Sequence, residues 1–262
     1  MPPRKSAHAA PAASPQDETL RSRRPRSPYG LDLVDRCSEC TLREKYLFCD
    51  LPIPALEHLD RIKSTAAYPK GALLFLEGQA PRGIFVLCAG RAKLSTSSAD
   101  GKTLILRIAQ PGEVLGLSAA ISGKPYEVTV EILEPAQANF VSRDHLLDFL
   151  RQHGEVAVRV AQELSNNYHS AYQEIRSLGL SSSAAEKLAK LLLEWSAEAE
   201  PGPGGVRMHM TLTHEEIAQL IGTSRETVTR ALGEMRRSQL IQIRGASVII
   251  PDRAALQELV KS

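Results

Sequence analysis

Residues 212–237 read LTHEEIAQLIGTSRETVTRALGEMRR and predict two short helices separated by a tight turn. Thr213 and Glu216 have the spacing of a capping box, an arrangement that begins many helices. Gly222 then interrupts the apolar pattern, and glycine adopts the left-handed backbone conformation without strain. These are the features of a helix-turn-helix. The alternative is a surface hairpin of two charged helices inside some other fold.

The second helix is predicted to bury one face and expose the other. Thr223 and Glu226 offer a capping box at its start. Its apolar residues recur at i, i+3, i+4 and i+7: Val228, Ala231, Leu232 and Met235. On the other face, arginine can pair with guanine and glutamate with the cytosine amino group, whereas a lone glutamate opposes non-specific phosphate binding. The expected DNA contacts are Thr223, Ser224, Arg225, Glu226, Thr229 and Arg230, with His214 near the DNA backbone rather than on a metal.

A β-hairpin is predicted directly after these helices. The short β-branched runs Leu240–Ile243 and Ser247–Ile250 are joined by the tight turn Arg244-Gly-Ala. Pro251 ends the second strand, and a short helix over 254–260 follows. A helix-turn-helix with a two-stranded wing is a winged-helix DNA-binding domain, which we expect to span residues 181–262.

Length and composition predict one to two domains and no membrane segment. The chain has 262 residues, and no apolar run approaches the roughly 18 residues that cross a bilayer. Residues 1–30 are rich in Pro, Ala and Ser and hold six Lys or Arg against two acidic residues, which predicts a disordered basic tail. They contain no apolar signal region, so a cytoplasmic location is expected. The net charge of +2 does not by itself indicate a nucleic-acid partner.

The middle of the chain has the pattern of an antiparallel β-structure. From Tyr68 to Phe140, about eight short β-rich runs alternate with turn residues. Asp100-Gly101 between two of these runs is a strong hairpin signal. We therefore expect a β-sandwich or barrel, placed as a sensory domain over residues 51–150, after a cysteine-bearing segment over residues 31–50.

A long helix is predicted next, over residues 151–180. Its apolar seam is narrow and close to a heptad, which favours a dimer interface over packing on the β-domain. A polar asparagine within the seam would fix the register of two paired helices. The expected interface residues are Val160, Leu164, Asn167, Ala171, Ile175 and Leu178. A further helix over 184–195 is expected to pack the two domains together.

This order of elements resembles the superfamily of the cyclic-AMP receptor protein and the fumarate-nitrate reductase regulator (CRP/FNR). The resemblance extends from about Leu51 to the end of the chain. PGEVLG at 111–116 is similar to the family's PGDxxG turn, and SRETVTR at 224–230 is similar to its recognition helix. It implies an α+β fold with a double-stranded, cyclic-nucleotide-binding-like β-roll, a dimerisation helix and a C-terminal winged helix-turn-helix. The implied function is a homodimeric transcription regulator, with double-stranded DNA and RNA polymerase as partners.

The residues expected to meet a cyclic nucleotide differ from the family's pattern. Members that bind such a ligand carry a glutamate for the ribose after the PGDxxG turn, and later an Arg-Ser pair for the phosphate. Here Leu117 follows the turn, and the later segment contains Glu127. A glutamate in place of an arginine reverses the electrostatics towards phosphate. Cyclic-nucleotide sensing is therefore not expected.

Four cysteines suggest a different sensor. Cys37, Cys40 and Cys49 lie within 13 residues, and Cys88 follows in the β-region. Such clusters in a reducing compartment usually hold metal or perform redox chemistry. Oxygen-sensing members of the resembled family hold a [4Fe–4S] cluster through three closely spaced cysteines and a fourth near the end of the roll. At that fourth position this chain reads Ala138-Asn139-Phe140, so Cys88 would have to substitute from a different strand.

Several functional alternatives remain open at this stage. The cysteines could hold an iron–sulfur cluster or zinc, form a thiol–disulfide switch, or belong to a metal-free segment in which Cys88 is a small buried hydrophobe. The leading hypothesis is a DNA-binding regulator controlled by oxygen or redox state. The second is the same architecture sensing a small molecule in the roll without metal. The third is an enzyme or scaffold built on the roll, although no nucleophile elbow, P-loop or paired carboxylates support catalysis.

Overall fold

The computed structural model describes residues 29–31, 33–43, 46–179, 183–197, 199, 201–202 and 204–261, and for 173–179, 201 and 261 it describes the backbone alone. The predicted tail over residues 1–30 therefore lies almost entirely outside the described residues. No helix of the described ranges combines the length and apolar character that a bilayer crossing requires.

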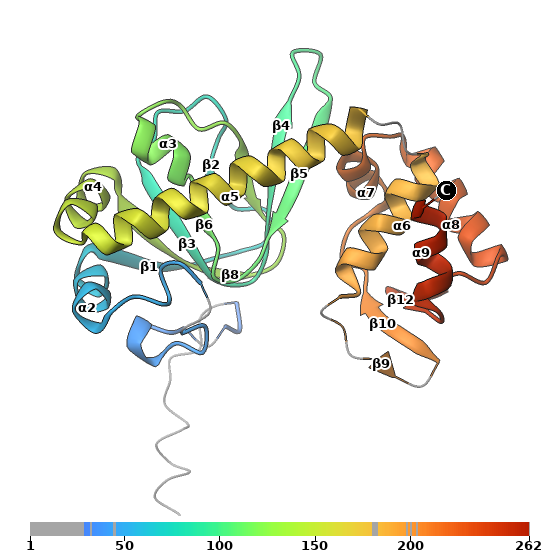
Figure 1. The fold of residues 1–262 in the computed structure, drawn as a ribbon, viewed down its shortest axis with the longest axis horizontal. Helices are drawn as coiled ribbons and strands as arrows, with labels where there is room; N and C mark the ends of the chain where they lie inside the picture. The colour runs from blue at the N-terminus through green and yellow to red at the C-terminus, as the bar shows by residue number, and fades with distance from the viewer. Residues whose placement is uncertain are drawn as a thin grey trace, which may run out of the picture.

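Two four-stranded sheets form the β-roll, as predicted (Figure 1). The strands of each pair antiparallel to their neighbours. The first sheet has the order β1 (Lys63–Tyr68), β8 (Ala136–Ser142), β3 (Gly83–Ala89) and β6 (Val114–Leu115). The second has the order β2 (Leu73–Phe75), β7 (Thr129–Ile132), β4 (Ala92–Ser97) and β5 (Thr103–Ala109).

The space between the sheets is filled by aromatic and aliphatic side chains. Tyr126 is 2% exposed, and its ring stacks on Phe75 with 3.9 Å between the ring centroids. The Tyr126 hydroxyl donates to the Gly83 carbonyl at 2.7 Å. Phe85 packs in the same cluster. Burial of this cluster is the main force that holds the two sheets together.

Short helices cover one end of the roll and were not predicted. They are α2 (Ile53–Ile62), α3 (Leu117–Ser122) and α4 (Arg143–Gln152). Ala55, Leu56 and Leu59 form the buried face of α2, and Leu146 and Phe149 that of α4. These faces share a second core cluster with Ile84 and Val141 of the first sheet. The N-terminal segment joins this cluster through Phe48.

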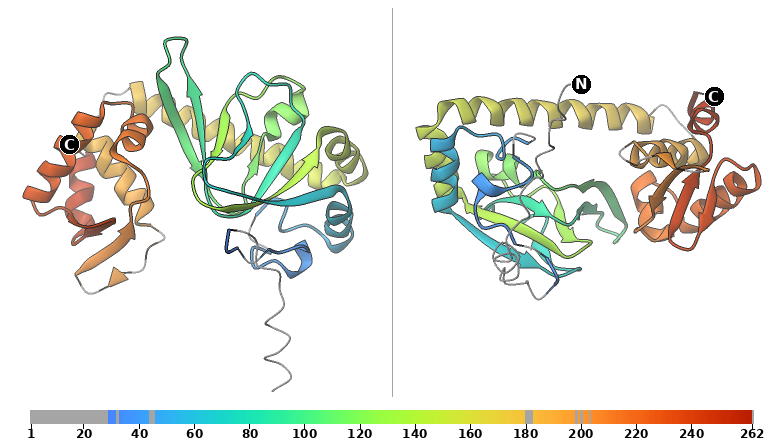
Figure 2. Two further views of the ribbon diagram at one scale, coloured as in Figure 1. Left: turned by 180° about the vertical axis from the view of Figure 1, so that it is seen from behind. Right: turned by 90° about the horizontal axis from the view of Figure 1, so that it is seen from below.

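Helix α5 (Gly154–Gly179) runs the length of the roll and continues to the winged domain (Figures 1 and 2). Val156 and Val160 of its first turns are 0% and 3% exposed and pack into the second core cluster. Leu164 packs against the same cluster. The assignment of Val160 to a dimer seam is therefore corrected, because its side chain is buried against the roll of its own chain, whereas Leu164 is only partly buried there.

The winged domain contains four helices and one sheet. Its helices are α6 (Ala184–Trp195), α7 (His214–Ile221), α8 (Arg225–Arg237) and α9 (Arg253–Lys261). The predicted wing strands are present as β11 (Gln242–Arg244) and β12 (Ser247–Ile250). They extend into a four-stranded sheet of order β11-β12-β10-β9, through β10 (Gly205–His209) and β9 (Pro201–Gly202). The segment before the helix-turn-helix thus contributes two strands to this sheet.

Candidate nucleic-acid interface and thiol pocket

The helix-turn-helix is built as its sequence predicts. The Thr213 side chain accepts from the Glu216 backbone, and the Glu216 carboxylate accepts from the Thr213 N–H at 2.8 Å, which completes a capping box at the start of α7. Gly222 ends α7 in the left-handed conformation with φ of 66°. This turn directs the chain into α8 within a few residues.

The cap of α8 differs from the prediction by one residue. Ser224, not Thr223, is the N-cap residue, and its hydroxyl accepts from the Thr227 N–H at 3.2 Å. Both side chains can cap a helix, so the pair Thr223 and Glu226 was a plausible capping box in the sequence. The length of the turn after Gly222 decides between the two candidates.

Helix α8 exposes the face that was predicted to contact DNA bases, which we call the reading face. Its four predicted core residues are all buried: Val228, Ala231, Leu232 and Met235. Arg225, Glu226 and Arg230 are exposed at the N-terminal half of the helix. Hydrogen bonds from its own backbone N–H and from the Ser224 side chain lower the pKa of Glu226, so this side chain is a charged acceptor at neutral pH.

Two residues that were predicted to contact DNA, Thr229 and His214, form hydrogen bonds within the protein. The Thr229 hydroxyl donates to the Arg225 carbonyl at 2.9 Å. The Nδ1 atom of His214 lies 3.0 Å from the same hydroxyl oxygen. His214 at the start of α7 thus ties the two helices together beside the reading face. Thr229 therefore helps to fix the position of α8 relative to α7.

All four cysteines line one cavity of about 150 Å³. Cys37 and Cys40 lie in and directly after the short 3-10 helix η1 (Cys37–Glu39), and Cys49 lies in the turn before α2. Cys88 approaches from β3 of the roll. The four thiols are free of disulfides. The structure therefore brings together a set that is spread over 52 positions of the sequence.

A β-bulge explains how Cys88 reaches this cavity. On β3, Leu87 pairs with Ala138 and Ala89 pairs with Gln137, which leaves Cys88 as the extra residue between them. A bulge of this kind redirects a side chain that regular pairing would place elsewhere. The resembled family carries its fourth cysteine in the region that reads Ala138-Asn139-Phe140 here, on β8. Cys88 therefore stands on the strand that pairs with this region.

The cavity is apolar in part and holds the thiols of Cys37, Cys49 and Cys88 in their neutral form. Leu59, Val86 and Val141 contribute to its wall. Burial raises the pKa of Cys37 to about 11 and that of Cys88 to about 12. Since the thiolate is the nucleophile, neutral thiols of this kind react slowly with oxidants. Deprotonation at neutral pH would need a metal or cluster.

Four thiols around one cavity are a donor set that an iron–sulfur cluster or a zinc ion would take. Zinc requires its sulfurs about 2.3 Å from one point. Within the described ranges, no three or more His, Cys, Asp or Glu side chains are arranged to hold a metal ion. A [4Fe–4S] cluster instead binds one cysteine at each iron, so it would use all four sulfurs around the cavity.

The region expected to receive a cyclic nucleotide has no cation at the predicted position. The Glu127 carboxylate accepts from the Ser118 hydroxyl at 2.8 Å, so the acidic side chain remains where a cyclic phosphate would bind. The neighbouring Tyr126 fills the space between the sheets and also bonds Gly83.

An exposed stripe follows α5 on the side away from the roll. Val158, Tyr168 and Tyr172 are 59%, 60% and 54% exposed. With the exposed Ala161 and Ser165 they recur at steps of three and four, the spacing of a coiled-coil seam. The rings of Tyr168 and Tyr172 contact each other, with 4.8 Å between their centroids. Asn167 and Ala171 of the predicted seam are also exposed, and the side chains of Ile175 and Leu178 lie outside the described residues.

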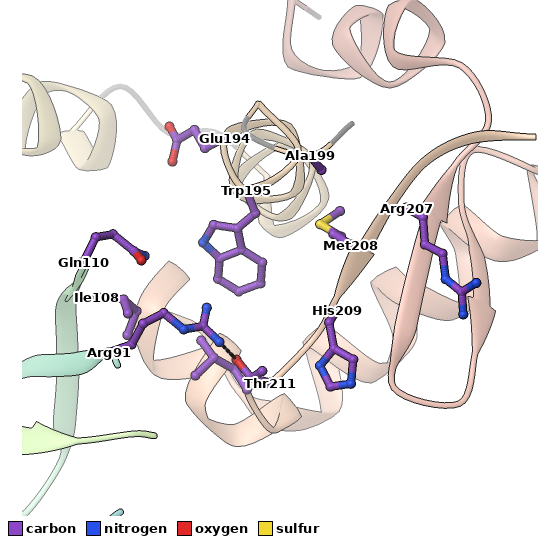
Figure 3. A pocket seen from close by; sticks show the side chains of 11 residues that line it. Arg91, Ile108, Gln110, Glu194, Trp195, Ala199, Arg207, Met208, His209 and Thr211 are labelled. Carbon is purple, nitrogen blue, oxygen red and sulfur yellow. Dashed lines mark hydrogen bonds between the residues drawn. The ribbon is translucent and has the colours of Figure 1, made fainter. Parts of the chain in front are cut away.

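The roll and the winged domain meet at a second cavity, of about 450 Å³ (Figure 3). Arg91 of the roll bonds both Glu134 and, at 2.5 Å, the Thr211 hydroxyl of the winged domain. Trp195 and His209 line the opposite side. Leu133, between β7 and β8, is buried in the core cluster of the winged domain. The domains are thus coupled by apolar and polar contacts.

Comparison with known proteins agrees with this architecture. Residues 65–153 match the cyclic nucleotide-binding domain family, and residues 186–259 match the Crp-like helix-turn-helix domain family. The CRP-like cAMP-activated global transcriptional regulator of Mycobacterium tuberculosis is 27% identical over 190 residues, which cover 72% of this chain and 84% of that protein. The fumarate and nitrate reduction regulatory protein of Vibrio cholerae is 24% identical over 225 residues, covering 85% and 89%.

A solved structure shows the same fold. The structure of FixK2 from Bradyrhizobium japonicum aligns with a TM-score of 0.67 at 22% identity, and the alignment covers 76% of this chain and 97% of that one. The order of roll, long helix and winged domain, the two domain matches and the relatives all lead to the same assignment. The chain is a member of the CRP/FNR family of DNA-binding transcription regulators.

Proposed function

We propose that this regulator binds palindromic DNA as a homodimer and is controlled by oxygen or redox state through a [4Fe–4S] cluster on Cys37, Cys40, Cys49 and Cys88. The observation that carries the proposal is the convergence of these four thiols on one cavity. The bulge that aims Cys88 at the cavity supports it further. The similarity to a fumarate and nitrate reduction regulatory protein is consistent with such a sensor. RNA polymerase is the expected further partner.

The cluster would supply the chemistry that responds to oxygen, and the protein would transmit the result. Phe48, Val86 and Val141 of the cavity wall belong to the same core cluster as Val156 and Val160 of α5. Protein cores are close-packed, so a change in the volume of the cavity displaces its neighbours. Loss of the cluster would therefore shift α5 relative to the roll.

The homodimer would form through the exposed stripe of α5. Two parallel helices paired through Val158, Tyr168 and Tyr172 bury apolar surface that the monomer leaves in water. Because α5 connects the roll to the winged domain, its position in the dimer sets the separation of the two α8 helices. DNA half-sites about one helical turn apart would match that arrangement.

The DNA-binding part of the proposal is tested by selecting sites from random duplexes with protein purified without oxygen. The expected result is a palindrome, bound more tightly before exposure to air than after it. Selection of a palindrome with equal affinity before and after air would support the regulator and contradict the oxygen control. Recovery of no preferred sequence would contradict the reading role of α8.

A further inference from the structure

The buried ammonium group of Lys63 indicates which charge is favoured in an occupant of the thiol cavity, the cavity lined by the four cysteines. Lys63, the first residue of β1, lines this cavity, and its side chain is 4% exposed. An ammonium group so far from water is costly unless charged or polar partners surround it. Lys63 Nζ donates to Asp60 Oδ1 at 2.6 Å and to Cys37 Sγ at 3.1 Å. The lysine therefore contacts a cavity sulfur directly.

The position of Lys63 is fixed by a network around Cys37. The Asp60 carboxylate accepts from the Cys37 N–H at 3.1 Å as well as from Lys63. Asn139, 4% exposed, accepts from the Thr65 hydroxyl and lies with its Nδ2 atom 3.9 Å from Cys37 Sγ. Cys37 Sγ thus receives N–H donors from two different strands. Such contacts to ligand atoms are a known means of tuning a metal centre.

The ammonium group of Lys63 can also donate a hydrogen bond to one more acceptor. An ammonium group carries three protons, and the described residues supply two partners, Asp60 and Cys37. The ion pair with Asp60 at 2.6 Å favours the charged form of this group. A protonated donor at the wall of a cavity lined by four thiols favours an anionic occupant. A tetrathiolate cluster is such an occupant.

We infer that Lys63 and Asp60 form a charge pair that sets the reduction potential of the cluster by acting on the Cys37 ligand. The inference rests on the proposed function, because it requires the cluster. Reduction adds an electron, so a nearby cation favours it and a nearby carboxylate opposes it. Lys63 and Asp60 are therefore positioning residues whose removal has opposite effects. Asn139 adds a weaker N–H contact to the same sulfur.

The test is a spectroelectrochemical titration of the full-length wild-type protein and four variants, all purified without oxygen. Lys63→Met removes the cation at similar side-chain length and is expected to shift the potential to more negative values. Asp60→Asn removes the carboxylate and is expected to shift it to more positive values. Lys63→Arg retains the charge and should restore a potential near that of the wild type. Lys102→Met, at an 86% exposed lysine of the β4–β5 hairpin, is the control and should cause no shift.

The reduction potential is expected to shift in opposite directions in Lys63→Met and Asp60→Asn. This difference distinguishes a charge effect from general damage to the site. A loosened cavity would move both variants in the same direction, which would overturn the inference. A wild-type cluster with unchanged potentials in both variants would overturn it too and leave the proposed function intact. Wild-type protein that binds neither iron nor sulfide would overturn both. If Lys63→Met does not fold, the pair Asp60→Asn and Lys63→Arg gives the same contrast, a positive shift against none.

Discussion

Lys93 Nζ of the roll lies 4.0 Å from the Glu216 carboxylate at the start of the helix-turn-helix. Lys93 is also bound to Glu131 within the roll at 2.9 Å. Glu216 closes the capping box with Thr213. A residue of the sensory domain therefore contacts the group that orders the first turn of α7. Movement of the roll can be transmitted to the DNA-binding helices at this contact as well as along α5.

Glu226→Ala is expected to relax DNA specificity at one base pair. The carboxylate is exposed at the start of α8 and charged, so it can accept from a cytosine amino group. Loss of that contact should reduce discrimination at the affected position by about 1–3 kcal/mol. The measurement is a binding-site selection with both proteins. Glu234→Ala, exposed later on the same helix, is the control, and an unchanged base preference for Glu226→Ala would contradict the assignment.

Ser224→Ala should destabilise the winged domain by about 1 kcal/mol, because it removes the N-cap hydroxyl of α8. Thr223→Ala should cost less, since Thr223 does not cap the helix. Chemical unfolding of the two variants side by side gives the comparison. A larger loss of the free energy of unfolding for Thr223→Ala would favour the cap predicted from the sequence.

Tyr168→Glu should weaken the dimer without unfolding the monomer. Tyr168 is 60% exposed on the stripe, and a charge at a desolvated seam is costly unless it is paired. Sedimentation at micromolar concentration would measure the loss, with the exposed Ser170→Glu on another face of α5 as control. Val160→Glu should instead destabilise the fold, since Val160 is 3% exposed in the core. A Tyr168→Glu protein that dimerises like the wild type would exclude the stripe.

The metal-free protein should lose stability at alkaline pH. Burial raises the pKa of Cys37 and Cys49 to about 11 and that of Cys88 to about 12, from 9.0 in the unfolded chain. The folded state therefore holds these protons more tightly. Its stability is retained below pH 9 and falls as the pH rises from about 9 towards 11 or 12. Unfolding titrations across that range should show a smaller fall for Cys88→Ser. A stability that rises above pH 9 would contradict the burial of these thiols.

Much of the DNA-binding domain could be predicted from the sequence, because its signals are local. The capping box at Thr213, the left-handed Gly222 and the apolar face of α8 each depend on residues within one or two turns. Within such short distances, side-chain spacing and backbone preference fix the structure. The cap of α8 was misplaced by one residue, since Thr223 and Ser224 have similar capping preferences.

The α5 register and the polar part of the thiol cavity could not be predicted. Val160 and Leu164 have the same apolar character whether they face a partner helix or the roll, so the pattern alone could not separate the two. Lys63 lies at the boundary between α2 and β1. At such a boundary the apolar periodicity of the sequence does not predict which way a side chain faces. Its contact Cys37 is 26 residues away, and Asn139 is 102 residues from Cys37. The position of Cys88 became interpretable only through the bulge in β3.

The central claim is that Cys37, Cys40, Cys49 and Cys88 together hold one oxygen-labile cluster. The most direct measurement is the iron and acid-labile sulfide content of wild-type protein and Cys88→Ser, both purified without oxygen. The wild type should be brown and contain about four irons and four sulfides per chain, and Cys88→Ser should lose them. A colourless wild-type protein without sulfide would contradict the cluster, and a cluster retained in full by Cys88→Ser would contradict the role of the fourth cysteine.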